Sequence, residues 1–318
     1  MKTLRIFLII IVTGIMAALV IYPERYIQSV QDGLKLFVIS VLPALFPFFF
    51  FSKILSALDV ASSMGRFIKK PLNKLFHSPP VGGYILIISL LSGYPVGAKL
   101  VSDCYKSGLI TQKQAQNISV FTSTSGPLFI LGAVGASMFR DKFAGAIILI
   151  SHYLGAIVNG LILTTKTYDE EKNILTNPID YDNILSESIT SSVMSVLIVG
   201  GYIAVFGMLI DVFTDFKILS FFSKTLTLFF IDEKIAYGLS ASIVEMTRGC
   251  LILSQSGPPF AVVPVCAAMI SFGGLSITLQ SLTFYSQCKI KPLFYLKTKI
   301  SQGIISYIAA TILCLIFY

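Results

Sequence analysis

The chain has 318 residues, of which 55% are hydrophobic and only 13% are charged, and its mean hydropathy is +0.82. This composition excludes a large water-soluble domain, because soluble chains carry about 25% charged residues. The net charge of +8 does not by itself indicate a nucleic-acid partner, since basic residues in a membrane protein mark the cytoplasmic side of the bilayer. The five cysteines are scattered without a C-x-x-C pair, which predicts neither a disulfide framework nor a zinc site.

The first apolar run covers residues 4–22 and follows a short basic stretch. Signal peptides share these features, but no small-residue cleavage site precedes Pro23, so we expect a retained transmembrane helix within residues 1–32. The next run, residues 34–58, is long enough to span a bilayer. It contains Pro43 and Pro47, which predict a kink.

A surface segment and two interrupted segments follow. Residues 60–77 have the basic amphipathic pattern of a helix that lies on the membrane. Residues 81–107 form two apolar arms around residues 92–97, and each arm of roughly 16 to 20 Å reaches the bilayer midplane without crossing it. This pattern predicts a re-entrant helical hairpin. Residues 111–139 are long enough to cross, but the polar run 122–127 interrupts them.

The first half ends with an uninterrupted span, residues 143–164, in which His152 and Asn159 are expected to make helix-packing hydrogen bonds. A polar, acidic stretch at residues 165–187 is expected to link this half to the second. The second half then repeats the order: a span at 191–212, a surface helix at 216–231, a hairpin at 235–254 around 245–249, a span at 260–282 broken at 271–274, and a final span at 296–317.

This order predicts an internal repeat of residues 33–164 and 188–318, with the paired breaks typical of secondary transporters. If each hairpin leaves on the side where it enters, each half crosses three times, and the second half is inverted. We therefore expect an all-α polytopic membrane protein, an inverted repeat with two re-entrant helical hairpins and two broken transmembrane helices. The alternative, in which the hairpin segments cross, gives a parallel repeat with breakers and charges in mid-helix. Positive-inside bias places the amino terminus in the cytoplasm and the carboxyl terminus outside.

The four breaks are expected to meet at one polar site, because irregular backbone at membrane depth must line a cavity or be buried in protein. Helices that start near the midplane point their positive ends inward, which attracts an anion. The expected binding residues lie at the breaks: Gly93, Tyr94, Pro95, Gly97 and Lys99 at the first hairpin, Ser123, Thr124, Ser125 and Gly126 in the first broken span, Glu245, Thr247, Arg248 and Gly249 at the second hairpin, and Gly273 and Gly274 in the second broken span.

Three charged residues at the hairpins decide the expected chemistry. Lys99 and Arg248 would face one pocket from opposite walls, although Lys99 could instead extend to the membrane surface. Glu245 precedes Arg248 by three residues, so it either pairs with that cation or titrates as a coupling site for protons. We find no zinc-protease, Walker or G-x-S-x-G motif and no stacking platform for nucleobases. We therefore expect no enzyme activity and no metal, cofactor or nucleic-acid partner. The expected partners are a small organic anion, the lipid bilayer and a coupling proton or sodium ion. The sequence does not decide whether the protein forms an oligomer.

The residues at the breaks also carry a family resemblance. In the first half it is carried by residues 91–99, LSGYPVGAK, with residues 124–135 and 152–155; in the second half it is carried by residues 245–249 and 271–276. These motifs resemble the YlbJ-type sporulation integral membrane proteins of the nucleoside-recognition (Gate-domain) superfamily. The order of elements is similar, more distantly, to concentrative nucleoside transporters, whose re-entrant hairpins and broken helices form the substrate site.

The resemblance implies transport of dipicolinic acid across the outer forespore membrane during endospore formation. A flat dianion with two carboxylates suits a pocket of helix N-termini with Lys99 and Arg248. Two other functions remain open on the sequence: a cation-coupled nucleoside transporter, and a non-transporting membrane scaffold or sensor of spore assembly.

Overall fold

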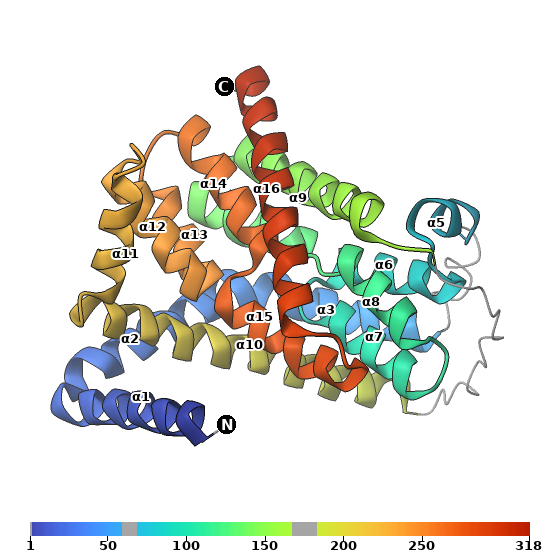
Figure 1. Ribbon diagram of the computed structural model, residues 1–318, viewed down its shortest axis with the longest axis horizontal. Helices are drawn as coiled ribbons and strands as arrows, with labels where there is room; N and C mark the ends of the chain where they lie inside the picture. The colour runs from blue at the N-terminus through green and yellow to red at the C-terminus, as the bar shows by residue number, and fades with distance from the viewer. Residues whose placement is uncertain (1, 59–68, 167–182) are drawn as a thin grey trace.

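The computed structural model describes residues 2–58, 69–166 and 183–318, and within these ranges the chain forms helices and no strands (Figure 1). In the first half these are α1 (Lys2–Ile21), α2 (Pro23–Leu36), the π-helix η1 (Phe37–Val41), α3 (Leu42–Ala57), α5 (Lys69–Phe76), α6 (Pro80–Ser92), α7 (Val96–Lys106), α8 (Gln112–Phe121), the π-helix η2 (Phe129–Phe139) and α9 (Lys142–Leu163).

The second half follows with α10 (Ile184–Asp215), α11 (Ile218–Thr227), α12 (Glu233–Val244), α13 (Met246–Ser254), α14 (Pro259–Phe272), α15 (Gly274–Tyr285), the 3₁₀ turn η3 (Ser286–Cys288) and α16 (Pro292–Phe317). Most of the predicted link at 165–187 and half of the predicted surface helix at 60–77 lie outside the described residues, and α5 occupies the rest of the surface segment up to Phe76. Helix α10 begins at Ile184, inside the predicted link.

Within the described ranges, four helices are long and apolar enough to cross a membrane: α9, α10, Pro259–Cys288 and α16. A bent pair of segments, Ile9–Ile21 with Pro23–Val41, adds a fifth candidate. Large apolar side chains on the outside, such as Val20 at 79% and Leu315 at 82% exposure, suit contact with lipid rather than water. The prediction of an all-α polytopic membrane protein is confirmed, while the inverted repeat and the sidedness stay predictions.

The expected kink in residues 34–58 takes the form of a π-helical turn. The helix starts earlier than predicted, at Pro23, and runs on through η1 into α3. Pro43 lacks the N–H that would bond to the carbonyl of Ile39, and its ring would clash there. In η1 the amide of Leu42 bonds to Phe37 O, five residues back, so one extra residue is accommodated in front of the proline.

All four predicted interruptions are present in the helices. Residues 93–95 separate α6 from α7, and a non-helical stretch that begins at Thr122 separates α8 from η2. In the second half the breaks are shorter, because Glu245 alone separates α12 from α13, and Gly273, at φ +86°, separates α14 from α15. The predicted surface segment at 216–231 contains the amphipathic helix α11.

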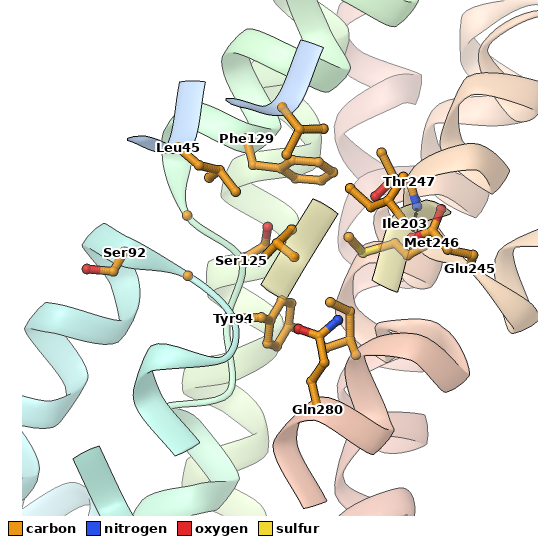
Figure 2. Close-up of a pocket in the computed structure, with 15 residues that line it drawn as sticks. Leu45, Ser92, Tyr94, Ser125, Phe129, Ile203, Glu245, Met246, Thr247 and Gln280 are labelled. Carbon is orange, nitrogen blue, oxygen red and sulfur yellow. Dashed lines mark hydrogen bonds between the residues drawn. The ribbon is translucent and has the colours of Figure 1, made fainter. Parts of the chain in front are cut away.

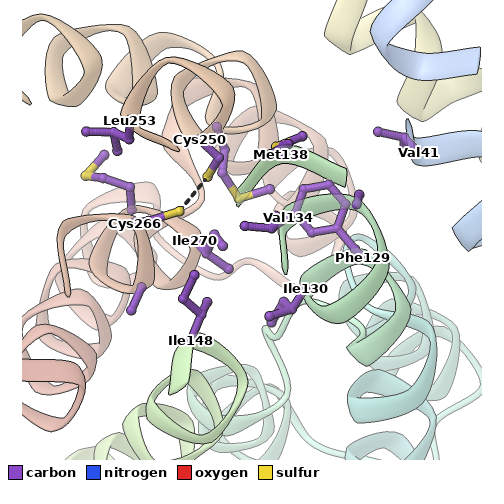
Figure 3. Packing of buried hydrophobic residues seen from close by; sticks show 14 of the residues in the cluster. Val41, Phe129, Ile130, Val134, Met138, Ile148, Cys250, Leu253, Cys266 and Ile270 are labelled. Carbon is purple, nitrogen blue, oxygen red and sulfur yellow. Dashed lines mark hydrogen bonds between the residues drawn. The ribbon is translucent and has the colours of Figure 1, made fainter. Parts of the chain in front are cut away.

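The two halves share one apolar core. Its buried side chains include Val41 of η1, Ile130 of η2, Ile148 of α9 and Ile270 of α14 (Figure 3). Helix α16 packs against both α9 and α14, and α7 of the first hairpin packs against α15. In Figure 1 the pairs α6–α7 and α12–α13 lie on opposite sides of α16. The helices of the interrupted segments are therefore fixed in position by packing against the rest of the helical bundle.

Candidate solute-binding site

A pocket of about 430 Å³, including its open side, lies where the interrupted segments converge. The first hairpin contributes Ser92, Gly93 and Tyr94, and the break before η2 contributes Ser125 and Gly126. In Figure 2 Tyr94, Ser125 and Phe129 lie on one side of the pocket. Residues from the two breaks of the first half thus line one cavity, as the sequence predicts for Gly93, Tyr94, Ser125 and Gly126.

The second half supplies the opposite wall. Glu245, Met246 and Thr247 come from the second hairpin, and Gln280 comes from α15 (Figure 2). The remaining lining is apolar and comes from η1, α3, η2, α10 and α15. A mostly apolar cavity with a few convergent polar groups is the usual form of a small-molecule site.

The two breaks of the first half touch through glycine. Gly93 has φ +77°, a conformation that L side chains rarely adopt, and a Cβ there would lie 2.4 Å from Gly126 N. A Cβ on Gly126 would in turn lie 3.1 Å from Leu91 O. Glycine is therefore required at Gly93 both for the turn and for the close approach of the two backbones.

The second hairpin is closed in a different way, by a carboxylate. Glu245 is 1% exposed, and its two oxygens accept from Thr247 N at 2.9 Å and Arg248 N at 2.6 Å. This caps the N-terminus of α13, which was expected to be open to a ligand. Gly274, at φ +66°, lies against this hairpin, because a Cβ there would be 2.6 Å from Ser242 O.

The prediction that Arg248 faces the pocket is wrong. Its guanidinium donates two hydrogen bonds to Asp211 of α10, at 2.8 and 2.6 Å, and a third to Gly207 O at 2.5 Å. It makes no side-chain pair with Glu245, which instead accepts from the backbone amide of Arg248. Asp211 lies 37 residues before Arg248 on another helix, so the sequence around Arg248 gives no signal for this pair.

Lys99 is also absent from the pocket lining, because it lies near Lys53 and Asp103 instead. The expected pair of cations on opposite walls is therefore not formed. The other predicted residues support the breaks from outside the lining: Pro95, Gly97, Ser123, Thr124, Gly249, Gly273 and Gly274. Gly97 and Gly249 do so by close packing, since a Cβ would meet Thr122 O at 2.4 Å and Ser242 Oγ at 2.1 Å.

His152 links the broken segments of the two halves. Its Nε2 accepts from Ser125 N at 2.8 Å, and its Nδ1 lies 2.7 Å from Ser271 Oγ. Since Ser271 donates its own proton to Ser306, the imidazole carries its proton on Nδ1. Asn159 donates to Thr298 O at 3.0 Å. The predicted packing roles of both side chains are confirmed.

Two polar residues at the site were not predicted. Gln280 is 3% exposed and its Oε1 has no hydrogen-bond partner. Its position seven residues after Gly273, two helical turns into an apolar arm, was an available signal. Lys299, near the start of the predicted span 296–317, is 1% exposed and bonds to Tyr94 OH behind the pocket.

These features define a polytopic α-helical membrane protein with a pocket between interrupted helices. Residues 38–142 match the family described as Nucleoside recognition (Gate). The chain is 28% identical, over 91% of its length and 77% of the relative, to the sporulation integral membrane protein YlbJ of Bacillus subtilis (strain 168). No solved structure matches. The family resemblance read from the break motifs is confirmed by these similarities.

Proposed function

We propose that this protein is an alternating-access secondary transporter of a small organic anion, foremost dipicolinate, across the outer forespore membrane during sporulation. The observation that carries the proposal is the pocket itself, which is lined by both hairpins and by the first broken span. Interrupted helices that meet at a central pocket are typical of secondary transporters. Similarity to a sporulation membrane protein supports sporulation as the setting. The orientation that we propose, with the amino terminus in the cytoplasm and the carboxyl terminus outside, follows from the positive-inside bias of the sequence.

The charge of the side chains that line the pocket determines whether an anionic substrate can bind there. Glu245 lines the pocket, whereas Lys99 and Arg248 do not. A dianion beside a buried carboxylate is strongly repelled, because Coulomb forces are less screened there than in water. We therefore propose that a proton on Glu245 accompanies the anion and serves as the coupling ion. Bound solute would contact Tyr94, Ser125 and Thr247 within the pocket.

A second candidate, a nucleoside transporter, is favoured by a specific feature of the pocket. Glu245 accepts hydrogen bonds from backbone amides, and the oxygen of Gln280 is an acceptor without a partner. Ribose hydroxyls and base N–H groups donate such bonds, and dipicolinate as a dianion does not. The matching family is described by nucleoside recognition, which agrees with this alternative.

Uptake into vesicles that contain the purified protein separates the candidates. Dipicolinate uptake that increases as the external pH falls, without uptake of uridine, is the result we expect. Uptake of uridine without uptake of dipicolinate would show that the substrate is a nucleoside and not an organic anion. If neither solute moves, while the gene still restores sporulation to a deletion strain, the protein is a scaffold or sensor instead of a transporter.

A further inference from the structure

Helix α16 carries a buried ammonium group behind the pocket. Lys299 is 1% exposed, and its Nζ donates to Tyr94 OH at 2.7 Å, Ser123 O at 2.9 Å and Gln302 Oε1 at 2.8 Å. A lysine ammonium has three donors and no acceptor. Each of its N–H groups therefore has an oxygen acceptor.

Two of the three acceptors belong to the interrupted segments of the first half, and the third, Gln302, lies on α16 itself. Tyr94 is at the tip of the hairpin, and Ser123 lies in the non-helical stretch before η2. The ammonium also lies 4.7 Å from the centroid of the Tyr94 ring, within the range of a cation–π interaction. The tyrosine hydroxyl in turn donates to Ile270 O in α14, at 3.3 Å. One positive charge thus joins both breaks of the first half to α16.

The oxygens around this charge are neutral. They are a hydroxyl, a backbone carbonyl and a side-chain amide, and among the described residues no carboxylate accepts from Lys299. Carbonyl and hydroxyl oxygens without a full counter-charge are the ligands with which proteins replace the hydration shell of an alkali cation. Ammonium and potassium ions are nearly equal in size, so the same cage suits either.

We propose that Lys299 is a built-in cation, which permanently occupies a monovalent-cation site formed by Tyr94, Ser123 and Gln302. The tethered charge holds the two first-half breaks in place where a dissolved ion would otherwise be needed. It follows that sodium does not couple to the protein at this position. This inference concerns the assembly of the site and is independent of the transported solute.

The test is chemical rescue of thermal stability in the full chain, purified in detergent. For the wild type we expect the same Tm in choline, sodium, potassium and methylammonium chloride. Lys299→Ala should have a lower Tm in choline, and potassium or methylammonium should restore most of the loss with a saturable dose dependence. A loss that is equal in all four salts would overturn the proposal, as would a wild-type Tm that requires sodium.

Two control variants separate the charge from the side-chain volume. Lys299→Met keeps an apolar stem in the site, so it should lose stability in every salt without rescue. Lys297→Ala, an exposed position on the same helix, should behave as the wild type. If Lys299→Ala does not fold, Lys299→Ala combined with Gln302→Glu takes its place. The added carboxylate strengthens the ion site, so replacing potassium by choline must lower the Tm of this double variant.

Discussion

Gly93 and Gly126 lie in direct backbone contact, so that a Cβ on Gly93 would be only 2.4 Å from Gly126 N. This contact joins the tip of the first hairpin to the break before η2, and both glycines line the pocket. The shape of one wall of the pocket therefore depends on the absence of a side chain.

Gly93→Ala should destabilise the protein and abolish solute binding together. In this variant, the positive φ of residue 93 and the displacement of the facing backbone by the new Cβ add strain of roughly 2 to 4 kcal/mol. Thermal unfolding and equilibrium binding of the purified variant measure the two effects. Gly201→Ala is the matched control, because nothing lies within 4 Å of a Cβ at that helical position. If Gly93→Ala binds solute as tightly as the wild type does, the contact between Gly93 and Gly126 does not determine the shape of the binding site.

Arg248 and Asp211 are expected to act on stability and only indirectly on binding. Removing either partner leaves a partly buried charge unpaired, which costs about 1 to 3 kcal/mol. A double-mutant cycle with Arg248→Ala and Asp211→Ala, followed by thermal unfolding, should show positive coupling. If Arg248→Ala unfolds at the wild-type temperature but no longer binds solute, the guanidinium contacts the ligand after all.

Gln280→Leu should weaken solute binding without lowering the thermal stability of the protein. The unpartnered oxygen of Gln280 contributes no hydrogen bond to the empty protein, and burying it unpaired has an energetic cost. The variant should therefore unfold at or above the wild-type temperature while it binds solute more weakly. A fall in stability together with unchanged affinity would show that this amide is structural.

Glu245→Gln distinguishes the two candidate substrates. If a proton on Glu245 accompanies dipicolinate, the neutral amide should bind the dianion at high pH as tightly as the wild type does at low pH. The pH dependence of binding should then be lost. If the substrate is a nucleoside that donates to the carboxylate, Glu245→Gln should weaken uridine binding at every pH. Binding isotherms across pH for both solutes measure the difference, and Asp232→Asn serves as a cap control on the exposed end of α12.

The positions of the breaks were predictable from the sequence because each is marked by local chemistry. Glycine and proline at residues 93–97 interrupt an apolar run, and so do Gly273 and Gly274. These signals come from residues that are adjacent in the chain, and the helices end at the positions where the glycine and proline residues predict an interruption. The convergence of three of the four predicted breaks on the pocket also follows, since unpaired backbone must be buried in protein or line a cavity, whereas Gly273 and Gly274 lie outside the lining.

The charged contacts were not predictable in the same way. Arg248 pairs with Asp211 and Lys299 bonds to Tyr94 across separations of 37 and 205 residues. Only the packing of α10 against the second hairpin and of α16 against the first-half breaks decides these partners. A lysine near the start of an apolar span looks like a surface anchor when its helix is read alone.

The most direct test of the pocket is protection of introduced cysteines by solute. Ser92→Cys and Thr247→Cys place a thiol on each wall, and Thr225→Cys places one on α11, away from the pocket. Dipicolinate, or uridine for the alternative substrate, should slow labelling of both pocket thiols by a water-soluble reagent and leave Thr225→Cys unchanged. Equal labelling rates at all three positions with and without either solute would contradict a binding site at the converging breaks.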